Sequence, residues 1–526
     1  MTLSRPLRVA VALDRRVVPR WICKVVSDIA SGDFAEIAFL IIEDRTERNR
    51  VAEHRTPALY RWYEQLDYRL FRSNPDALAR ADVSSDVAGI PALHGSPPAS
   101  DFETVDLILW FASSRPPAHT DGVATYGRWF PVGVVDAFWP MYEQSAISTF
   151  FIVVDGSKAL HDGVVYRSTS AVDPISLYRN RNNSCWKAAH MLVKHIRLLA
   201  AERQYEVEPT PVDGLERLYR IPSTRQLIRH GLRVVAKATR RQLESRVFWE
   251  PWFIAYRERP SDDVPPAVDA ESFRLVVAPP GRFFADPFVV EREGRHYVFL
   301  EDYSDSVARA VISCFELGVD GNPGPVCVVL EREYHLSYPF VFEHDGEMWM
   351  IPETRDAGRI ELYRADAFPR RWSFERELIA DVAAVDATVF EDGERYWLFA
   401  SVALDGVRIG EDLFLYWSSS PFGPWTPHPR NPVVSDARCA RPAGRIFRSG
   451  GHFVRPAQDA SLRYGAAVVF KRIDKLTEKE YRETEIGRID PAWLEGNCGT
   501  HSYNFNGRYE VLDARRRRRR PRTKSH

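Results

Sequence analysis

The sequence predicts two folded parts, an N-terminal α/β domain with a doubly wound sheet and a C-terminal all-β five-bladed β-propeller. Apolar strands alternate with helical segments in the first part, and a β-hairpin unit recurs five times in the second. The 526 residues are 45% hydrophobic and 12% aromatic, which is enough for a large core in each part. We divide the chain into residues 1–205 (α/β domain), 206–270 (helical basic and aromatic connector), 271–513 (propeller) and 514–526 (Arg-rich tail).

The first part of the chain opens with a βαβ pattern. An apolar strand at Arg8–Leu13 is followed by helical spacing at Val17–Ala30 and a second apolar strand at Ala35–Ile42. Nearly uninterrupted apolar strands are typical of a parallel sheet that helices cover on both faces. Further candidates continue the pattern: a helix at 59–70, strands at 107–111, 149–154 and 164–166, and a long amphipathic helix at 176–201. This order predicts a doubly wound domain.

Several classes of function are excluded by simple patterns. No GxGxxG follows the first strand and no Walker loop occurs, so we expect no nucleotide-phosphate cradle. The 71 basic and 72 acidic residues leave a net charge of −1, which excludes a protein that coats nucleic acid, and we expect no specific nucleic-acid partner. Six cysteines without a CxxC pair favour free thiols over disulfides or a zinc site, and we expect no metal and no cofactor.

The hydropathy of the chain predicts a soluble protein. The apolar run Val9–Leu13 is too short for the core of a signal peptide, and no run approaches the roughly 18 apolar residues of a membrane span. Because free thiols are typical of a reducing compartment, we expect a cytoplasmic protein. Peripheral contact with the inner membrane is the alternative localisation.

A basic amphipathic helix is predicted in the connector. Ser223 can cap its N-terminus, and apolar residues recur at near-helical spacing (Leu227, Ile228, Leu232, Val235 and Leu243). Seven basic residues against one acidic residue give residues 222–246 a net charge of +6. This helix either connects the domains with a solvated Arg face or lies on an anionic membrane. We expect the aromatic cluster that follows, at 248–256, to hold the two domains together.

The second half of the chain contains an internal repeat. Each copy is a strand, a polar turn with glycine and a second strand, and the copies begin at Asp286, Tyr338, Asp386, Arg441 and His501. The copies are 48 to 60 residues apart, as expected for propeller blades with two hairpins each. Five copies predict five blades, and residues 273–278 can close the ring against the last one.

The first residue of each copy is predicted to face the central channel at one mouth of the propeller. Two carboxylates, a phenol, a guanidinium and an imidazole then converge there. Burying such groups costs several kcal/mol unless they pair or stay hydrated. We therefore predict a polar ligand site at this mouth. The alternative is that Asp286 and Asp386 form ion pairs with Arg441 and simply close the channel.

The first part of the chain carries a weak family resemblance. Its similar segments are Asp106–Phe111, Gly127–Val134, the Phe138-Trp139 pair and 149–165 with His161-Asp162-Gly163. They resemble the N-terminal domain of formyltransferases that use a folate-borne formyl group. The resemblance implies that Asp162 is a remnant of that family's catalytic Asn, His and Asp, because Gly127–Gly133 replaces the Asn-x-His-Pro motif. Sugar N-formyl transfer and an inactive binding or assembly domain, with Asp162 as a turn residue, are the two alternatives.

The propeller repeats carry a more specific resemblance. The matching segments are 284–288, 338–354, 386–388, Arg441-Pro442-Ala443-Gly444 and His501-Ser502-Tyr503-Asn504. Over about residues 273–513 they resemble the five-bladed N-terminal domain of plant glucosamine inositolphosphorylceramide transferases and their bacterial relatives. The resemblance implies a transferase-associated, carbohydrate- or glycolipid-directed function in glycoconjugate biosynthesis. The expected partner is a sugar, sugar nucleotide or glycolipid.

The same segments are more distantly similar to five-bladed glycoside hydrolases. That similarity implies catalytic roles for Asp286 and Asp386, with Glu353 as the best substitute for the general acid. The fourth blade offers Arg441, Arg445 and Arg455 where those enzymes place a Glu, which favours an anionic ligand. The predicted ligand-binding residues are Tyr338, Arg441, His501, Glu301 and Arg455. Glycoside hydrolysis is therefore the second hypothesis, after a binding or transferase-associated role.

The chain ends in a strongly basic tail. Arg515–Arg520 is an unbroken arginine run, and Arg522 and Lys524 follow it. Such a tail is expected to be a disordered, solvated extension, with contact to an anionic membrane as the alternative. Together with residues 222–246 it forms the predicted peripheral membrane contact.

Overall fold

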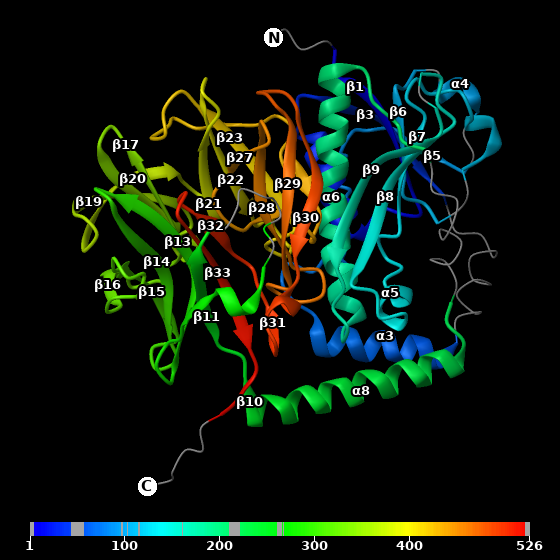
Figure 1. The fold of residues 1–526 in the computed structure, drawn as a ribbon. Coiled ribbons are helices and arrows are strands. Elements are labelled where there is room, and N and C mark those ends of the chain that lie inside the picture. The colour runs from blue at the N-terminus through cyan, green and yellow to red at the C-terminus, as the bar shows by residue number, and fades with distance from the viewer. Residues whose placement is uncertain are drawn as a thin grey trace. The chain divides into compact units, whose positions relative to one another are not determined.

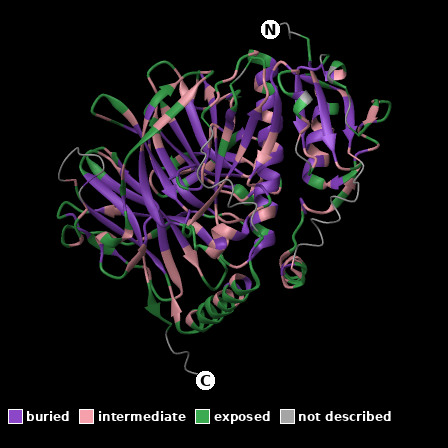
Figure 2. Ribbon diagram, turned by 90° about the vertical axis from the view of Figure 1, so that its right-hand side faces the viewer, coloured by how far each residue is buried: buried purple, intermediate pink, exposed green. Residues whose placement is uncertain are grey.

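The chain folds into an α/β unit and an all-β unit (Figure 1). The computed structural model describes residues 5–43, 57–95, 98–102, 104–113, 116–159, 161–209, 221–259, 266 and 268–520. The first unit comprises Met1–Ala238 with Leu404–Arg408, and the second comprises Thr239–Ala403 with Ile409–His526. Strands of both units are largely buried, whereas many connecting loops are exposed (Figure 2). All six cysteines are free, as predicted.

The first unit is built on a seven-stranded mixed sheet in the order β5-β3-β1-β6-β7-β8-β9. The strands from β5 to β7 run parallel, whereas β8 and β9 are antiparallel to their neighbours. Their bounds are β1 Leu7–Leu13, β3 Ala35–Ile42, β5 Ala92–His94, β6 Leu107–Trp110, β7 Arg128–Val132, β8 Ile147–Asp155 and β9 Gly163–Ala171. The predicted βαβ opening is confirmed, and the hairpin β8–β9 extends the sheet without a crossover helix.

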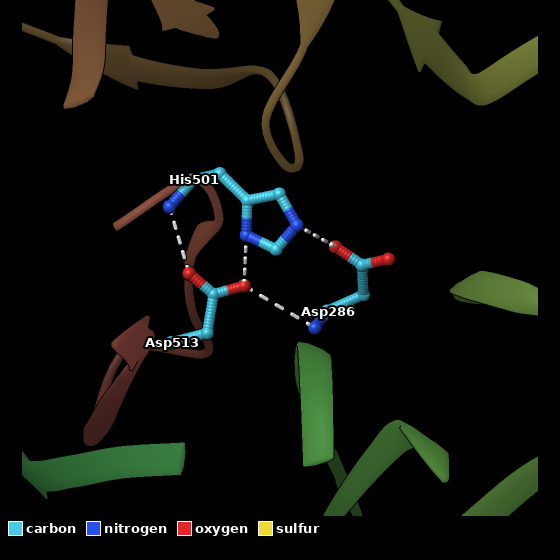
Figure 3. Close-up of side chains that lie close together, drawn as sticks. All are labelled: Asp286, His501 and Asp513. Carbon is cyan, nitrogen blue, oxygen red and sulfur yellow. Dashed lines mark hydrogen bonds and ion pairs between the residues drawn. The ribbon is translucent and has the colours of Figure 1, made fainter. Parts of the chain in front are cut away.

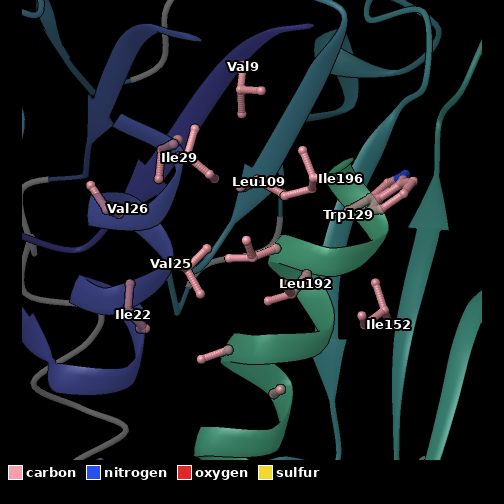
Figure 4. Packing of buried hydrophobic residues seen from close by; sticks show 14 of the residues in the cluster. Val9, Ile22, Val25, Val26, Ile29, Leu109, Trp129, Ile152, Leu192 and Ile196 are labelled. Atoms are coloured by element: carbon pink, nitrogen blue, oxygen red, sulfur yellow. The ribbon is translucent and has the colours of Figure 1, made fainter. Parts of the chain in front are cut away.

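The two long packing helices of this unit, α1 (Arg20–Ala30) and α6 (Leu177–Glu202), cover the same face of the sheet. Figure 4 shows Val25 of α1 and Leu192 of α6 pointing into the core that also contains Val9 and Leu109. Among the described residues, the other face carries a smaller cluster with Phe102 from the short helix α4 (Ala99–Phe102). The α/β prediction is therefore confirmed at the level of a mixed sheet with helices, and the finer doubly wound arrangement is not.

The remaining elements of the first unit are short or peripheral. Helix α1 begins only after Pro19, because proline excludes an α conformation at Val18, and β2 (Val17–Pro19) pairs with β4 (Arg80–Asp82). Helices α3 (Ala58–Phe71) and α5 (Phe138–Tyr142) share an apolar cluster with Leu177 of α6. The helix predicted from residue 17 therefore starts three residues later.

The second unit is a five-bladed β-propeller, as predicted. Each of the first four blades contains a sheet of antiparallel strands in sequence order. The bounds are β13 Arg282–Arg292, β14 Arg295–Ser304, β15 Arg309–Leu317 and β16 Cys327–Leu330 in blade 1; β17 Ser337–His344, β18 Glu347–Glu353, β19 Ile360–Ala367 and β20 Arg371–Ile379 in blade 2; β21 Ala384–Glu391, β22 Tyr396–Val402, β23 Asp412–Ser418, β24 Thr426–Pro427 and β25 Val434–Ser435 in blade 3; and β26 Arg441–Pro442, β27 Phe447–Ser449, β28 His452–Asp459, β29 Ala467–Leu476 and β30 Tyr481–Ile489 in blade 4.

The fifth blade closes the ring with strands from both ends of the propeller sequence. It contains β11 (Trp252–Glu258), β12 (Arg274–Val276), β31 (Asn497–Gly499), β32 (Tyr503–Phe505) and β33 (Tyr509–Arg516). Strand β11 pairs with both β12 and β33, so the predicted closing segment reaches the last blade through β11. The expectation that the aromatic cluster joins two domains is wrong for Phe253 and Tyr256, which are buried inside this blade.

The first arginines of the tail are ordered. Strand β33 extends to Arg516, and β34 (Arg518–Arg519) pairs with β10 (Phe248–Trp249). The guanidinium of Arg517 lies 4.1 Å from the ring centroid of Phe248, and that of Arg515 lies 5.1 Å from the ring of Trp252. The expectation of a disordered extension is therefore wrong for residues 514–520, because aromatic rings stack on these side chains. Residues 521–526 lie outside the described residues.

The helix predicted in the connector is present as α8 (Thr224–Val247). Ser223 Oγ accepts from Gln226 N at 3.4 Å, and Gln226 Oε1 accepts from Ser223 N at 2.9 Å. This reciprocal pair is a capping box and confirms the predicted start of the helix. Among the described residues, no helix combines the length and the apolar composition that crossing a bilayer requires.

One glycine between blades 4 and 5 permits a close backbone approach. Gly444 has a φ of 147°, and a Cβ there would lie 2.0 Å from the carbonyl oxygen of Tyr503. Tyr503 N donates to the Ala443 carbonyl at 2.8 Å, so the two segments are fixed to one another. Gly444→Ala is therefore expected to lower the free energy of unfolding by more than about 3 kcal/mol, measured by urea unfolding.

Gly450→Ala is the matched control for this prediction. Gly450 also has a positive φ, 56°, but nothing lies within 4 Å of the position that a Cβ would take there. Its substitution should cost only the backbone strain of about 1 kcal/mol. Equal losses in the two variants would show that the approach of Tyr503 has no energetic effect.

Candidate functional site

Three blades begin with the same unusual backbone conformation. Asp286, Tyr338 and Asp386 have φ values of 48°, 43° and 56°, in the left-handed region that is rare for residues other than glycine. Each lies at a β-bulge, where the pairing of the inner strand shifts register. Such strain costs about 1–3 kcal/mol per residue and is concentrated at functional sites. Its recurrence at three equivalent positions marks this part of the propeller as a candidate site.

Asp286 lies in a buried triad with His501 and Asp513 (Figure 3). His501 Nε2 is 3.5 Å from Asp286 Oδ1, and His501 Nδ1 contacts Asp513 Oδ2. Asp513 Oδ1 accepts from the backbone N–H of His501 at 2.7 Å, and Ser502 Oγ donates to Asp286 Oδ1 at 2.7 Å. The indole of Trp252 stacks on the imidazole at a centroid distance of 4.1 Å. These contacts fix the plane of the His501 ring between two carboxylates.

The triad is arranged to share a proton. Burial raises the pKa of Asp286 to about 7, and Glu301, Asp386 and Asp513 add to this rise, although attraction to His501 opposes it. Burial opposes a charge on His501, but Asp513 and Asp286 outweigh this effect and raise the pKa of the imidazole. An imidazole and a carboxyl whose pKa values are both raised, and which face each other at 3.5 Å, can share a proton.

The same three side chains form a group that could hold a metal ion. Their ligand atoms lie within 4.8 Å of one another. However, both ring nitrogens of His501 face carboxylate oxygens, and both oxygens of Asp513 accept backbone N–H groups of His501, Ser502 or Asp286. A metal would need these lone pairs, which are already engaged. The donor set therefore fits proton sharing better than metal binding.

A second cluster joins three of the predicted residues. Arg441 donates through Nε to Asp386 Oδ2 at 2.5 Å and through Nη2 to Asp386 Oδ1 at 3.4 Å. Arg441 Nη2 is also 3.6 Å from Glu353 Oε2. Gln458 Nε2 donates to Asp386 Oδ2 at 2.9 Å, and Tyr338 Oη is 2.9 Å from Thr388 Oγ1. Asp386 is thus held by a bidentate arginine and an amide.

Glu353 is the least satisfied carboxyl in this cluster. Among the described residues, its Oε2 atom has no hydrogen-bonding partner. Burial and the charge of Asp386 raise the pKa of Glu353 well above its usual range, although Arg441 opposes the rise. A protonated carboxyl whose hydrogen-bonding capacity is incompletely used can donate a proton to a group that enters the site. This property fits the sequence-based choice of Glu353 as a candidate acid, which stays a prediction.

The edge of the site is aromatic and acidic. The guanidinium of Arg441 lies 5.0 Å from the ring centroid of Tyr464, whose ring is 5.1 Å from that of His501. His335 Nε2 is 3.3 Å from Glu301 Oε1, and this contact raises the pKa of His335 against the effect of burial. The charge of Glu301 also raises the pKa of Asp286, so the two carboxyls belong to one electrostatic cluster.

Some predicted residues lie elsewhere or have other partners. Arg455 is 1% exposed and forms a bidentate pair with Glu483 at 2.9 and 2.8 Å, within the fourth blade. Arg445 donates to the carbonyl of Val341, and burial lowers its pKa to about 10. In the first unit, Asp162 Oδ1 accepts from Gly156 N at 2.8 Å, as a turn residue does. The structure therefore does not bring Arg455 to the candidate site.

The sequence reasoning missed Asp513, Ser502, Gln458, Tyr464 and His335. A signal for Asp513 was present, because it directly follows the apolar run of the second strand of its repeat, as Glu301 and Glu353 follow theirs. Ser502 lies beside His501 in the fifth copy, and the other three lie in segments that the repeat does not align. Only strand pairing brings Gln458 opposite Arg441.

The sequence of the propeller is similar to that of known proteins. Residues 266–519 match the family described as "Glucosamine inositolphosphorylceramide transferase 1, N-terminal". The propeller resembles that transferase region. The rice protein of this name (Oryza sativa subsp. japonica) is 34% identical over 239 residues, which are 45% of this chain and 32% of the rice protein. The Arabidopsis thaliana protein is 35% identical over 230 residues, 43% of this chain and 29% of that protein.

These matches cover only part of each protein. The chain spans about a third of the length of the plant relatives, at 32% and 29%. The matching family region begins at residue 266, so it leaves the formyltransferase resemblance of the first unit as a prediction. The resemblance predicted for residues 273–513 is confirmed.

Comparison with solved structures gives likenesses to part of this chain at low TM-scores. A family 117 glycoside hydrolase from Zobellia galactanivorans is 11% identical with a TM-score of 0.34, over 50% of this chain and 90% of that one. An α-L-arabinanase from Cellvibrio cellulosa, solved with arabinohexaose, is 16% identical with a TM-score of 0.29, over 38% of this chain and 77% of that one.

Proposed function

We propose that this protein has a glycolipid- or glycoconjugate-related function and that its propeller binds a sugar group at the site formed by Asp286, Asp386, Glu353 and Arg441. The observation that carries the proposal is the convergence of the strained inner-strand residues Asp286 and Asp386 with the buried, incompletely satisfied carboxyl of Glu353. Structural need alone seldom places such groups together, because each unpaired buried carboxyl destabilises the fold. The names of the plant relatives, which include glucosamine and inositolphosphorylceramide, support the same class of ligand.

The charge of the site favours a neutral or amine-bearing sugar. Five carboxyl groups surround it (Asp286, Glu301, Glu353, Asp386 and Asp513), of which Glu353 has a strongly raised pKa, against three basic residues (His335, Arg441 and His501), so the site has no excess of positive charge for an anion. Arg441 is already paired with Asp386, and Arg455 with Glu483. The expectation of an anionic ligand rested on these two arginines and on Arg445. Because the first two are already paired with carboxylates, we propose a polyol or an amino sugar as the ligand instead of an anionic sugar.

Glycoside cleavage is the second candidate, and Glu353 is the observation that favours it. Its raised pKa suits a general acid, and Asp286, with a pKa of about 7, could act as the base or nucleophile on the other side of a scissile bond. Such a reaction needs both carboxyls to reach the substrate. Asp286 Oδ1 already accepts from Ser502 and faces His501, which leaves it poorly placed to attack a substrate, so binding without cleavage is the simpler function.

The substitution Glu353→Gln separates these two functions. It keeps the shape of the side chain but removes the acid proton. We expect the variant to bind amino-sugar glycans within about threefold of the parent chain, measured by isothermal titration calorimetry. If the site cleaves glycosides, the parent chain should turn them over, and the turnover of the variant should fall by about 10²–10⁴-fold while its binding changes little.

The sugar-binding experiment has a matched control variant and an outcome that would contradict the proposal. Glu394→Gln alters a side chain that is 82% exposed and should change neither binding nor turnover. A panel should include glucosamine-bearing, neutral and carboxylated glycans. Absence of binding to the entire panel by the parent chain, or a preference for carboxylated sugars, would contradict the proposal.

A further inference from the structure

Helix α8 is anchored to the first unit along one side only. Leu227 and His230 are 5% and 2% exposed, and Leu227 packs with Phe138 of α5. His230 Nε2 is 3.3 Å from Tyr63 Oη, and its ring lies 5.1 Å from that of Phe138. Arg233 Nη1 donates to the carbonyl of Tyr142 at 3.3 Å. These contacts determine which side of the helix points away from the unit.

The opposite side of α8 carries an apolar stripe in contact with solvent. The exposed fractions are 52% for Ile228, 68% for Leu232, 64% for Val235 and 57% for Leu243. Their spacing of four, three and eight residues places them on one face of an α-helix, about 100–180° around the axis from Leu227 and His230. From Ile228 to Leu243 the stripe is about 22 Å long at 1.5 Å per residue. Contiguous exposed side chains of this size mark an interaction surface.

Basic residues border this stripe. Arg225, Arg229 and Arg246 are exposed and lie on or beside the face that carries the stripe, whereas Lys237 and Arg241 are exposed on the opposite side of the helix. Among the described residues, no ion pair involves Arg225, Arg229 or Lys237, whereas Arg240 pairs with Glu244 at 2.9 Å. The groove between Ile228 and Leu232 is lined by Arg225, Arg229 and Arg233, so long cationic side chains flank an apolar floor.

We propose that α8 docks this protein on the surface of an anionic lipid bilayer. The apolar stripe enters the boundary between headgroups and acyl chains, and the arginine side chains contact the lipid phosphates beside it. A helix with this charge lies in the plane of the membrane and does not cross it. This inference does not depend on the sugar site of the propeller.

Charge decides between a membrane and other occupants of the stripe. A second copy of α8 would bring one segment with a net charge of +6 against another, with Glu244 as the one acidic residue that each segment offers. Nucleic acid would satisfy the arginines but would leave Leu232 and Val235 in water. An anionic bilayer satisfies both kinds of side chain.

The experiment is co-sedimentation of the full chain with vesicles. Phosphatidylcholine vesicles are compared with vesicles that contain about 30% phosphatidylglycerol, at low and high salt. We expect binding to the anionic vesicles only, weakened at least tenfold at about 0.5 M salt. Leu232→Gln with Val235→Gln, and separately Arg225→Gln with Arg229→Gln, should each weaken binding at least tenfold.

The matched controls are Leu462→Gln, at a side chain that is 75% exposed elsewhere on the propeller, and Arg482→Gln, at an exposed arginine. Both should bind vesicles as the parent chain does, and circular dichroism should show the same helix content in all variants. Lack of binding to anionic vesicles, or binding unchanged by the α8 variants, would overturn the proposal. A dimer that Leu232→Gln dissociates in analytical ultracentrifugation, without vesicle binding, would assign the stripe to a second copy instead.

Discussion

Replacing Asp386 with alanine is expected to lower the free energy of unfolding of the propeller by about 3–5 kcal/mol. Asp386 is 0% exposed, and it accepts two bonds from Arg441 and one from Gln458. Without this carboxylate, the largely buried guanidinium keeps the more distant Glu353, at 3.6 Å, and the ring of Tyr464, and the amide of Gln458 loses a partner. Urea unfolding, followed by tryptophan fluorescence, measures the loss.

Two further variants separate charge from packing in this cluster. Asp386→Asn keeps the volume of the side chain and its preference for a left-handed backbone, so its cost should come from the missing charge alone. Glu394→Ala removes an exposed carboxylate from its pair with Arg395 and should cost less than about 1 kcal/mol. If Asp386→Ala were no more costly than Glu394→Ala, the ion pair of Arg441 would not hold this site together.

The propeller is expected to become more stable as the pH falls from 8 to 5. Asp286 has a pKa of about 7 in the folded state, raised by burial, against about 3.9 in an unfolded chain. Between these values the folded state binds a proton that the unfolded state has released, so stability decreases as the pH rises. The contribution of Asp286 between pH 5 and pH 8 is about 2–3 kcal/mol.

His501 acts in the same direction. Its folded pKa is raised, so its stabilising contribution is complete below about pH 6.5 and is lost as the pH rises through the folded value. Asp286→Asn should therefore remove a large part, but not all, of the pH dependence of the urea midpoint.

Asp381→Asn is the control for the pH experiment, because Asp381 is exposed and shares the left-handed backbone of Asp286, with a φ of 52°. It should leave the pH dependence unchanged. A urea midpoint that rises between pH 5 and pH 8 in the parent chain would contradict the assignment of the triad.

Local sequence patterns predicted most of the elements. The strand Ala35–Ile42 and the repeat units beginning at Asp286, Tyr338 and Asp386 follow from apolar runs, glycine turns and alternation. These signals succeed because strand and turn preferences depend on neighbouring residues. The first unit was predicted less well, since the direction of β8 and β9 depends on which edge they join and not on their own composition.

For the candidate site, the sequence by itself determined which residue types begin the five blades, and hence that Asp286, Asp386, Arg441 and His501 would meet. Only the tertiary structure decided their partners. Asp286 contacts His501 from a distant part of the chain, and β11 enters the last blade opposite β33, which ends the propeller sequence. The same holds for Arg515, which is ordered because Trp252 lies under it. Burial, ion pairing and stacking arise between distant segments, so no local pattern records them.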